Sequence, residues 1–325
     1  MTSPTESAVS ETRPKATTSN QAALTAARSK AQELGLDLLT VTLPSSDLEV
    51  AYLSIGSGPL ALCLHGYPDS AWTWRHLLPA LAEAGYCAVA PFSRGYSPTA
   101  LATDNNYQSG VLGVDANELH QALSADSQAV IIGHDWGAMG AYSAAVLEPD
   151  RWRRVVAAAV PPGPVMAQAF FNYDQLRMSW YMFFQLNPLS EMMIPMNEFE
   201  FITRLWQDWS PGYDCTEDVA HFAACMPTPE NLAAALGYYR KTLQSELQDP
   251  ELAHAQAAVF EIPTQPLLYL HGMADGCMEP ALPATTGDYL TVPGSRAVMV
   301  DNAGHFLQLE QPAEVNAQIL SFLAE

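Results

Sequence analysis

Hydrophobic and polar positions in the first half of the chain predict strands and helices in turn. Residues 38–43 and 48–55 alternate between apolar and polar positions, as strands at the antiparallel edge of a sheet do. Residues 59–64 form a continuous apolar run, which is typical of a strand buried on both faces. The pattern continues with helices expected at 71–84, 113–123 and 136–146, and strands at 86–90, 129–132 and 154–160. Strands that alternate with helices predict an α/β fold, with a mostly parallel sheet covered on both faces.

The alternation stops at the proline-rich segment 161–164. The following residues show only helical segments rich in Phe, Trp, Met and Tyr. Strands are expected again at 266–270 and 296–300, followed by a terminal helix at 314–323. We therefore predict a core domain made of residues 36–163 and 258–325, with a helical cap at 164–257. Because active sites in such sheets lie beyond the carboxyl ends of the strands, the cap is expected to cover that edge and exclude water.

Composition narrows the function classes. The formal net charge of -21 and the lack of a basic run argue against nucleic acid as a partner. Residues 1–35 are expected to form a flexible extension ending in an Ala-rich helix, and no segment resembles a signal peptide or a membrane span. The five Cys are scattered without metal-ligand spacing. These features predict a cytoplasmic enzyme without cofactor or metal, acting as a monomer or homodimer on a neutral substrate and not on a membrane.

The segment Gly133-His134-Asp135-Trp136-Gly137 lies between a predicted strand and a predicted helix. A G-x-S-x-G elbow in this position exposes a nucleophile at the edge of a sheet, and here Asp takes the place of Ser. A carboxylate nucleophile forms an ester when it attacks a saturated carbon, and water can then cleave that ester at the enzyme's own carbonyl. Taken alone, the segment is equally compatible with Asp135 as an N-cap of the following helix.

A base and an orienting acid are expected after the nucleophile in chain order. His305 follows the last predicted strand in the segment 302–306, which makes it the candidate base. Asp275 follows the preceding strand and is the candidate acid that orients His305. Asp301 and Asp288 are weaker candidates for the acid. Asp301 is too close to His305 in sequence to reach behind the imidazole easily.

The segment that begins at His65 follows the buried strand at 59–64 and occupies the usual place of an oxyanion-hole donor. We assign the two backbone donors to Tyr67 and Trp136. His65 itself is interpreted as a hydrogen-bonded scaffold residue.

Together these motifs resemble the epoxide hydrolase branch of the α/β-hydrolase superfamily, over nearly everything from Leu36 onward. The resemblance rests on His65-Gly66-Tyr67-Pro68-Asp69, Arg94-Gly95-Tyr96-Ser97-Pro98, the segment around Asp135, and the late Asp275 and His305. One departure is Phe92-Ser93, where the family often has Asp two residues before the Arg-Gly-Tyr segment. We interpret that position as structural.

The resemblance implies two cap tyrosines that hydrogen-bond the epoxide oxygen and protonate it. Tyr181 and Tyr239 are the candidates, although the register leaves open whether Trp180 occupies the first position. Tyr239 shares a helical stripe with Leu232, Leu236 and Leu243, so it is expected to point inward. The expected contacts to substrate are Trp180, Phe184, Trp136 and Phe306.

The sequence thus predicts a cofactor-independent hydrolase that opens a small apolar epoxide to a vicinal diol. Two alternatives remain. A haloalkane dehalogenase shares the fold and the Asp nucleophile, but it needs a halide pocket and no proton donor for the leaving group. A non-catalytic receptor for a small ligand could also use this fold.

Overall fold

The computed structural model describes residues 18–325 of the chain. Helix α1 (Thr18–Glu33) lies where the Ala-rich helix was predicted, and the tail expected before it falls outside the described residues. Within residues 18–325 no helix combines the length and the apolar character that crossing a membrane requires.

The core is one sheet of eight strands with the order β1-β2-β4-β3-β5-β6-β7-β8. β1 and β2 pair antiparallel, β2 pairs antiparallel with β4, and the remaining pairs are parallel. The strands are β1 (Asp37–Thr42), β2 (Glu49–Gly56), β3 (Leu60–Leu64), β4 (Cys87–Pro91), β5 (Val130–His134), β6 (Arg154–Ala158), β7 (Leu267–Gly272) and β8 (Arg296–Val300). This arrangement confirms the predicted α/β-hydrolase fold. The antiparallel pair lies at one edge, and the fully buried β3, β5, β6 and β7 lie in the centre.

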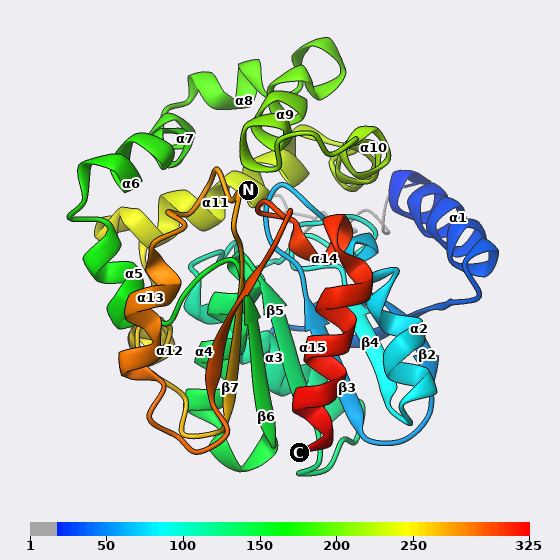
Figure 1. Ribbon diagram of the computed structural model, residues 1–325. Helices are drawn as coiled ribbons and strands as arrows, with labels where there is room; N and C mark the ends of the chain where they lie inside the picture. The colour runs from blue at the N-terminus through cyan, green and yellow to red at the C-terminus, as the bar shows by residue number, and fades with distance from the viewer. Residues whose placement is uncertain (1–17) are drawn as a thin grey trace, which may run out of the picture.

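Helices cover both faces of the sheet (Figure 1). α3 and α4 pack against each other, and α4 lies on β5 and β6. On the other side of the sheet α2 packs on β2 and β4, and α15 packs on α2 and β7. Besides α1, the helices that pack around the sheet are α2 (Leu77–Glu83), α3 (Gly110–Ala122), α4 (Trp136–Leu147), α12 (Ala253–Ala258), α13 (Leu282–Thr286), α14 (Leu307–Glu310) and α15 (Pro312–Ala324).

The predicted helix at 71–84 is divided in the structure. A 3-10 turn covers Ala71–Trp74, and α2 begins afresh at Leu77. Pro79 explains the division, because proline is tolerated in the first turn of a helix but removes a backbone hydrogen bond in the middle of a longer one.

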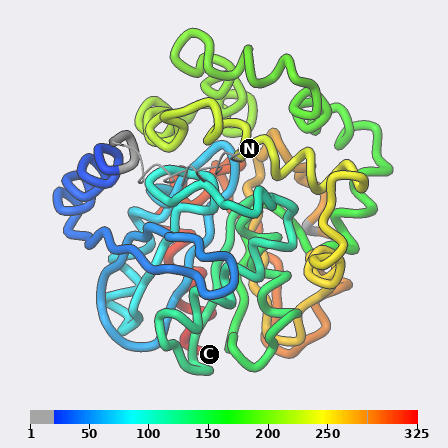
Figure 2. The backbone as a smooth tube through the Cα atoms, turned by 180° about the vertical axis from the view of Figure 1, so that it is seen from behind, coloured from blue at the N-terminus to red at the C-terminus, as the bar shows by residue number. Residues whose placement is uncertain are grey.

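The chain between β6 and β7 is described throughout, and it contains no strand. Its helices are α5 (Gly163–Ala169), α6 (Tyr173–Met178), α7 (Trp180–Gln185), α8 (Leu189–Met193), α9 (Met196–Trp209), α10 (Thr216–Cys225) and α11 (Pro229–Leu243), followed by α12. In Figures 1 and 2, α6 to α11 form a layer above the sheet edge that lies opposite the C-terminus. The guanidinium of Arg75 links core to cap by donating to Asp218 of α10 at 2.7 Å. The domain limits at 163/164 and 257/258 stay a prediction, and α12 packs on the core helices α3 and α4.

Candidate active site

Asp135 forms the sharp turn between β5 and α4. Its backbone has φ 54 and ψ -120, and residues other than glycine rarely adopt a positive φ of this kind. Gly137 permits the turn, since a Cβ there would lie 2.1 Å from the carbonyl oxygen of Leu64. Within the described residues the Asp135 side chain makes no capping hydrogen bond to α4. The helix-cap interpretation therefore loses its physical basis.

Groups from two other loops contact the carboxylate of Asp135. The backbone N–H of Tyr67, which follows β3, donates to Oδ1 of Asp135 at 2.8 Å. Nε2 of His305, which follows β8, lies 3.7 Å from Oδ2. Asp135 is 6% exposed, so the carboxylate is held in a nearly dry environment. One oxygen is thus fixed by a backbone donor and the other faces the imidazole.

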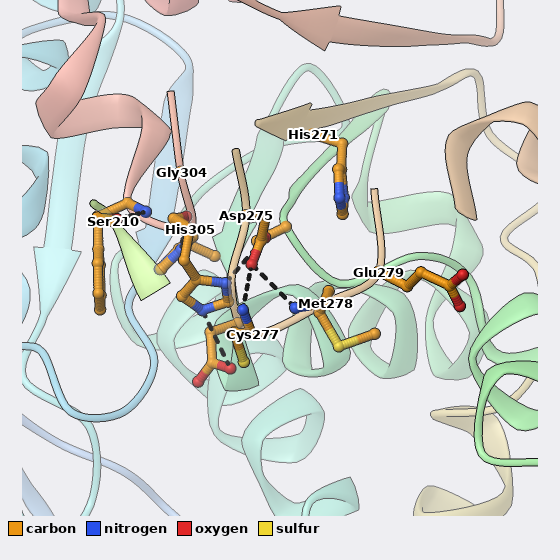
Figure 3. A network of polar contacts seen from close by, with 12 residues as sticks. Ser210, His271, Asp275, Cys277, Met278, Glu279, Gly304 and His305 are labelled. Carbon is orange, nitrogen blue, oxygen red and sulfur yellow. Dashed lines mark hydrogen bonds and ion pairs between the residues drawn. The ribbon is translucent and has the colours of Figure 1, made fainter. Parts of the chain in front are cut away.

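His305 and Asp275 form a buried pair (Figure 3). Nδ1 of His305 lies 3.1 Å from Oδ2 of Asp275, and both side chains are fully buried. Burial alone would lower the pKa of His305, but the charges of Asp275 and Asp135 outweigh it and raise the pKa to about 10. Burial acts to raise the pKa of Asp275, yet His305 shifts it below its usual value. The alternative acids, Asp301 and Asp288, are both exposed.

Backbone amides hold the other oxygen of Asp275. Oδ1 accepts from the N–H of Cys277 at 2.7 Å and from the N–H of Met278 at 2.9 Å, and Figure 3 shows both bonds. We call residues 275–279 the acid loop. These two bonds fix the carboxylate so that Oδ2 remains directed at the imidazole.

The predicted oxyanion donors, Tyr67 and Trp136, both lie next to Asp135. Tyr67 already donates to the carboxylate, and Trp136 is the first residue of α4, where helical N–H groups lack partners within the helix. His65 has the geometry of a scaffold residue, because its Nε2 accepts from the N–H of Ser93 at 3.0 Å and its Nδ1 contacts the carbonyl of Gly66 at 2.9 Å. Burial lowers the pKa of His65 to about 4, which keeps the ring neutral.

The two candidate tyrosines come from the cap and meet above the elbow. The rings of Tyr181 and Tyr239 lie edge to face with centroids 5.8 Å apart, and the ring of Tyr239 also contacts that of Trp136 at 4.9 Å. Burial, with a contribution from the nearby Asp135 charge, raises the pKa of both phenols well above the ordinary value, so both stay protonated. The hydroxyl of Tyr239 has no hydrogen-bond partner among residues 18–325.

The structure separates Tyr181 from its neighbour Trp180. Tyr181 is 4% exposed and faces Tyr239, whereas Trp180 is 46% exposed. Trp180 packs on Phe184 and Phe201 and lines a groove of about 330 Å³ together with residues of α8 and α9. Of these two residues, only Tyr181 therefore lies on the buried side of the cap, next to Tyr239.

Of the other expected substrate contacts, only the ring of Trp136 lies against the cap tyrosines, through its contact with Tyr239. Phe184 is partly buried against Phe201 in the cap. Phe306 is fully buried and stacks on Trp206, and its ring lies edge to face with that of His305 at a centroid distance of 5.1 Å. Phe306 thus supports the imidazole, and we do not propose a substrate contact for it or for Trp180.

Sequence reasoning missed the contacts that join the cap to the acid loop. The carbonyl of Trp209, the last residue of α9, accepts from the N–H of His305 at 3.0 Å and from that of Gly276 at 3.1 Å. Glycine is required at 276, because a Cβ there would lie 2.0 Å from the carbonyl oxygen of Asp208. Cys277 was not singled out among the five scattered Cys, although its position two residues after Asp275 could have marked it.

Comparisons with known proteins agree with this geometry. Residues 59–312 match the family model described as the alpha/beta hydrolase fold. The chain is 31% identical to "Epoxide hydrolase" of Caballeronia sordidicola, over 82% of this chain and 88% of that protein. It is 30% identical to "Epoxide hydrolase A" of Mycobacterium tuberculosis, over 82% of this chain and 90% of that protein. The solved structure of a Bacillus megaterium epoxide hydrolase with an inhibitor superposes with a TM-score of 0.73 at 25% identity, covering 88% of this chain and 100% of that one.

Proposed function

This chain belongs to the alpha/beta hydrolase fold family, in its epoxide hydrolase branch, and from that premise we propose that it hydrolyses an apolar epoxide to a vicinal diol through an ester on Asp135. One observation carries the proposal. The buried carboxylate of Asp135 lies between the N–H of Tyr67 and the imidazole of His305, beneath two protonated tyrosines of the cap.

In the first step an oxygen of Asp135 attacks an epoxide carbon, and the electron pair of the breaking C–O bond moves to the epoxide oxygen. The phenols of Tyr181 and Tyr239 hydrogen-bond that oxygen and supply the proton that it needs. General acid help of this kind is worth about 10²–10⁴-fold. A hydroxyl that is buried without a partner, as in Tyr239, is ready to bind an incoming acceptor.

In the second step His305 takes a proton from water, and the hydroxide attacks the carbonyl carbon of the ester. The N–H groups of Tyr67 and Trp136 stabilise the oxyanion that forms. Asp275 holds the imidazole and stabilises its positive charge. Collapse of the tetrahedral intermediate releases the diol, and the oxygen that leaves Asp135 takes the second proton of the water. The proton on His305 then passes to the tyrosine that protonated the epoxide oxygen. Atoms and charges then balance as epoxide plus water giving diol.

Labelled water tests the ester directly. In a single turnover in H₂¹⁸O with styrene oxide and excess enzyme, the ester route predicts a diol without label and one ¹⁸O atom in Asp135, found by mass spectrometry of the peptide. Direct attack of water on the epoxide would place the label in the diol of the first turnover. That result would exclude the ester, and the absence of any diol across a panel of aryl and alkyl epoxides would exclude the activity.

A haloalkane dehalogenase is the second candidate, and one observation favours it. The indole N–H of Trp136 is buried and has no hydrogen-bond partner among the described residues, as a donor to a leaving halide should be. A dehalogenase has no use for two protonated tyrosines. Halide release from a panel of chloro- and bromoalkanes, without diol formation from epoxides, would establish this function instead. Ligand binding with neither product would indicate a receptor.

A further inference from the structure

The acid loop is held from both sides. On the core side, the N–H groups of Cys277 and Met278 donate to Asp275. On the cap side, the fully buried amide of Gln175 in α6 donates to the carbonyl of Cys277 at 3.0 Å and accepts from the N–H of Glu279 at 2.8 Å. Four consecutive amides from Gly276 to Glu279 thus have defined partners, since that of Gly276 bonds to Trp209. The path of this short segment is fully determined.

The side chain of Cys277 points toward the cap tyrosine. Its Sγ lies 3.4 Å from the hydroxyl of Tyr181, and Cys277 is 1% exposed. The ring of Tyr181 is fixed by Trp209 at 4.6 Å and by Tyr239 at 5.8 Å. These rings set the plane of the phenol, but the thiol is the polar partner of its hydroxyl. The hydroxyl of Tyr239 has no such partner in the described part of the chain.

We propose that Cys277 is a positioning residue that holds the hydroxyl of Tyr181. One residue of the acid loop then fixes Asp275 through its backbone N–H and Tyr181 through its side chain. This inference rests on the proposed function. A thiol is a weak donor and a weak acceptor, so it can orient the phenol and still yield when the substrate oxygen arrives. When it donates its S–H to the phenol oxygen, it leaves the phenol O–H free for the epoxide.

The chemical state of Cys277 suits this role. Burial and the charges of Asp275 and Asp135 raise the pKa of the thiol well above its ordinary value. The group therefore stays an uncharged S–H, which is a poor nucleophile and does not compete with Asp135 for the epoxide. A thiolate at this place would repel the carboxylate that it adjoins.

The test separates the two chemical steps. Cys277→Ala removes Sγ but keeps the backbone N–H that holds Asp275. We expect ester formation, measured by stopped flow with styrene oxide, to slow about 3- to 10-fold, as the loss of one hydrogen bond implies. Hydrolysis of the ester should stay within about twofold, because that step depends on His305 and Asp275. A selective loss of hydrolysis would overturn the proposal.

A double-mutant cycle excludes a merely structural effect. In a Tyr181→Phe background, Cys277→Ala should slow ester formation by less than about 1.5-fold, since the hydroxyl that it positions is gone. Equal slowing in both backgrounds would show that Cys277 acts by packing alone. Cys277→Ser keeps a hydrogen donor and should be faster than Cys277→Ala. A rate no better than that of the alanine variant would count against the contact.

Cys63→Ala is the matched control, because Cys63 is a fully buried thiol in β3 away from the cap. It should leave both steps unchanged, and melting temperatures of all variants check that each is folded. If the wild type and Cys63→Ala form no diol, the proposed function fails. If they form it and the cycle is additive, only the role of Cys277 fails.

Discussion

The two halves of the candidate site are built in opposite ways. In the core half, Asp135 and Asp275 each have an oxygen fixed by backbone N–H groups, and each has the other directed at His305. Among residues 18–325, the hydroxyl of Tyr239 in the cap half is unpaired, and the hydrogen-bond partner of the Tyr181 hydroxyl is a thiol. Charged groups in a dry interior need partners, whereas neutral phenols can be left open for a ligand. The core half is therefore preorganised, and under the proposed function the cap half would complete its hydrogen bonds only when substrate binds.

Removing the nucleophile should have the largest effect. Asp135→Asn keeps the size of the side chain but loses the charge, and we expect diol formation to fall by at least about 10⁴-fold. Steady-state turnover of styrene oxide measures this loss. Slow recovery of activity should coincide with a mass increase of about 1 Da at residue 135, because hydrolysis of the amide restores Asp. Undiminished activity in freshly prepared protein would place the nucleophile elsewhere.

Removing the base should divide the reaction in two. His305→Gln leaves Asp135 and both tyrosines in place, so the ester should form while its hydrolysis falls about 10²–10⁴-fold. Intact-protein mass spectrometry should then show a stable adduct of one substrate per chain. Multiple turnovers at the normal rate would mean that another group activates water.

Removing an open phenol should slow only the first step. Tyr239→Phe is expected to reduce ester formation by about 10²-fold, because the leaving oxygen loses a donor. The ester, once formed, should be hydrolysed at the normal rate. Tyr181→Phe gives the paired comparison, and its effect should be similar because each variant keeps one of the two donors. Full activity of Tyr239→Phe on epoxides would remove it from the mechanism.

The charge of Asp135 should be visible in the titration of His305. In the free enzyme the charges of Asp275 and Asp135 raise the pKa of His305 above its ordinary value. Asp135→Asn, or ester formation, removes one of the two charges that raise it, so the pKa should fall. Histidine NMR of both proteins tests the direction, with Asp275 retained in each. An unchanged pKa would show that Asp135 is not coupled to the imidazole.

The smallest effect is expected on the outer face of the cap. Trp180→Ala removes a half-exposed ring that packs on Phe184 and Phe201 of the cap. Rates of ester formation and hydrolysis should stay within about twofold, in contrast to Tyr181→Phe at the adjacent position. A loss as large as that of Tyr181→Phe would show that the register of the cap tyrosine is wrong.

Much of the core could be predicted because its signals are local. A buried strand is a short apolar run, and a tight turn needs small residues, so β5 and its elbow are apparent from residues 129–137. The cap was harder. Several of its helices are short, and its aromatic residues pack partly on one another, so their composition does not say which face points to the site. Trp180 and Phe184 of the cap were predicted as substrate contacts for that reason.

The sequence by itself determined the order of strands and helices, and the placing of Asp135, Asp275 and His305 each after the end of a strand. In a parallel sheet such loops must meet at one edge, so their proximity follows from chain order. Tertiary structure alone decided that Tyr181 and not Trp180 faces Tyr239, and that Cys277 contacts the phenol. Those facts depend on how a helix is rotated against a loop about a hundred residues away. Packing sets that rotation, and no local pattern of residues records it.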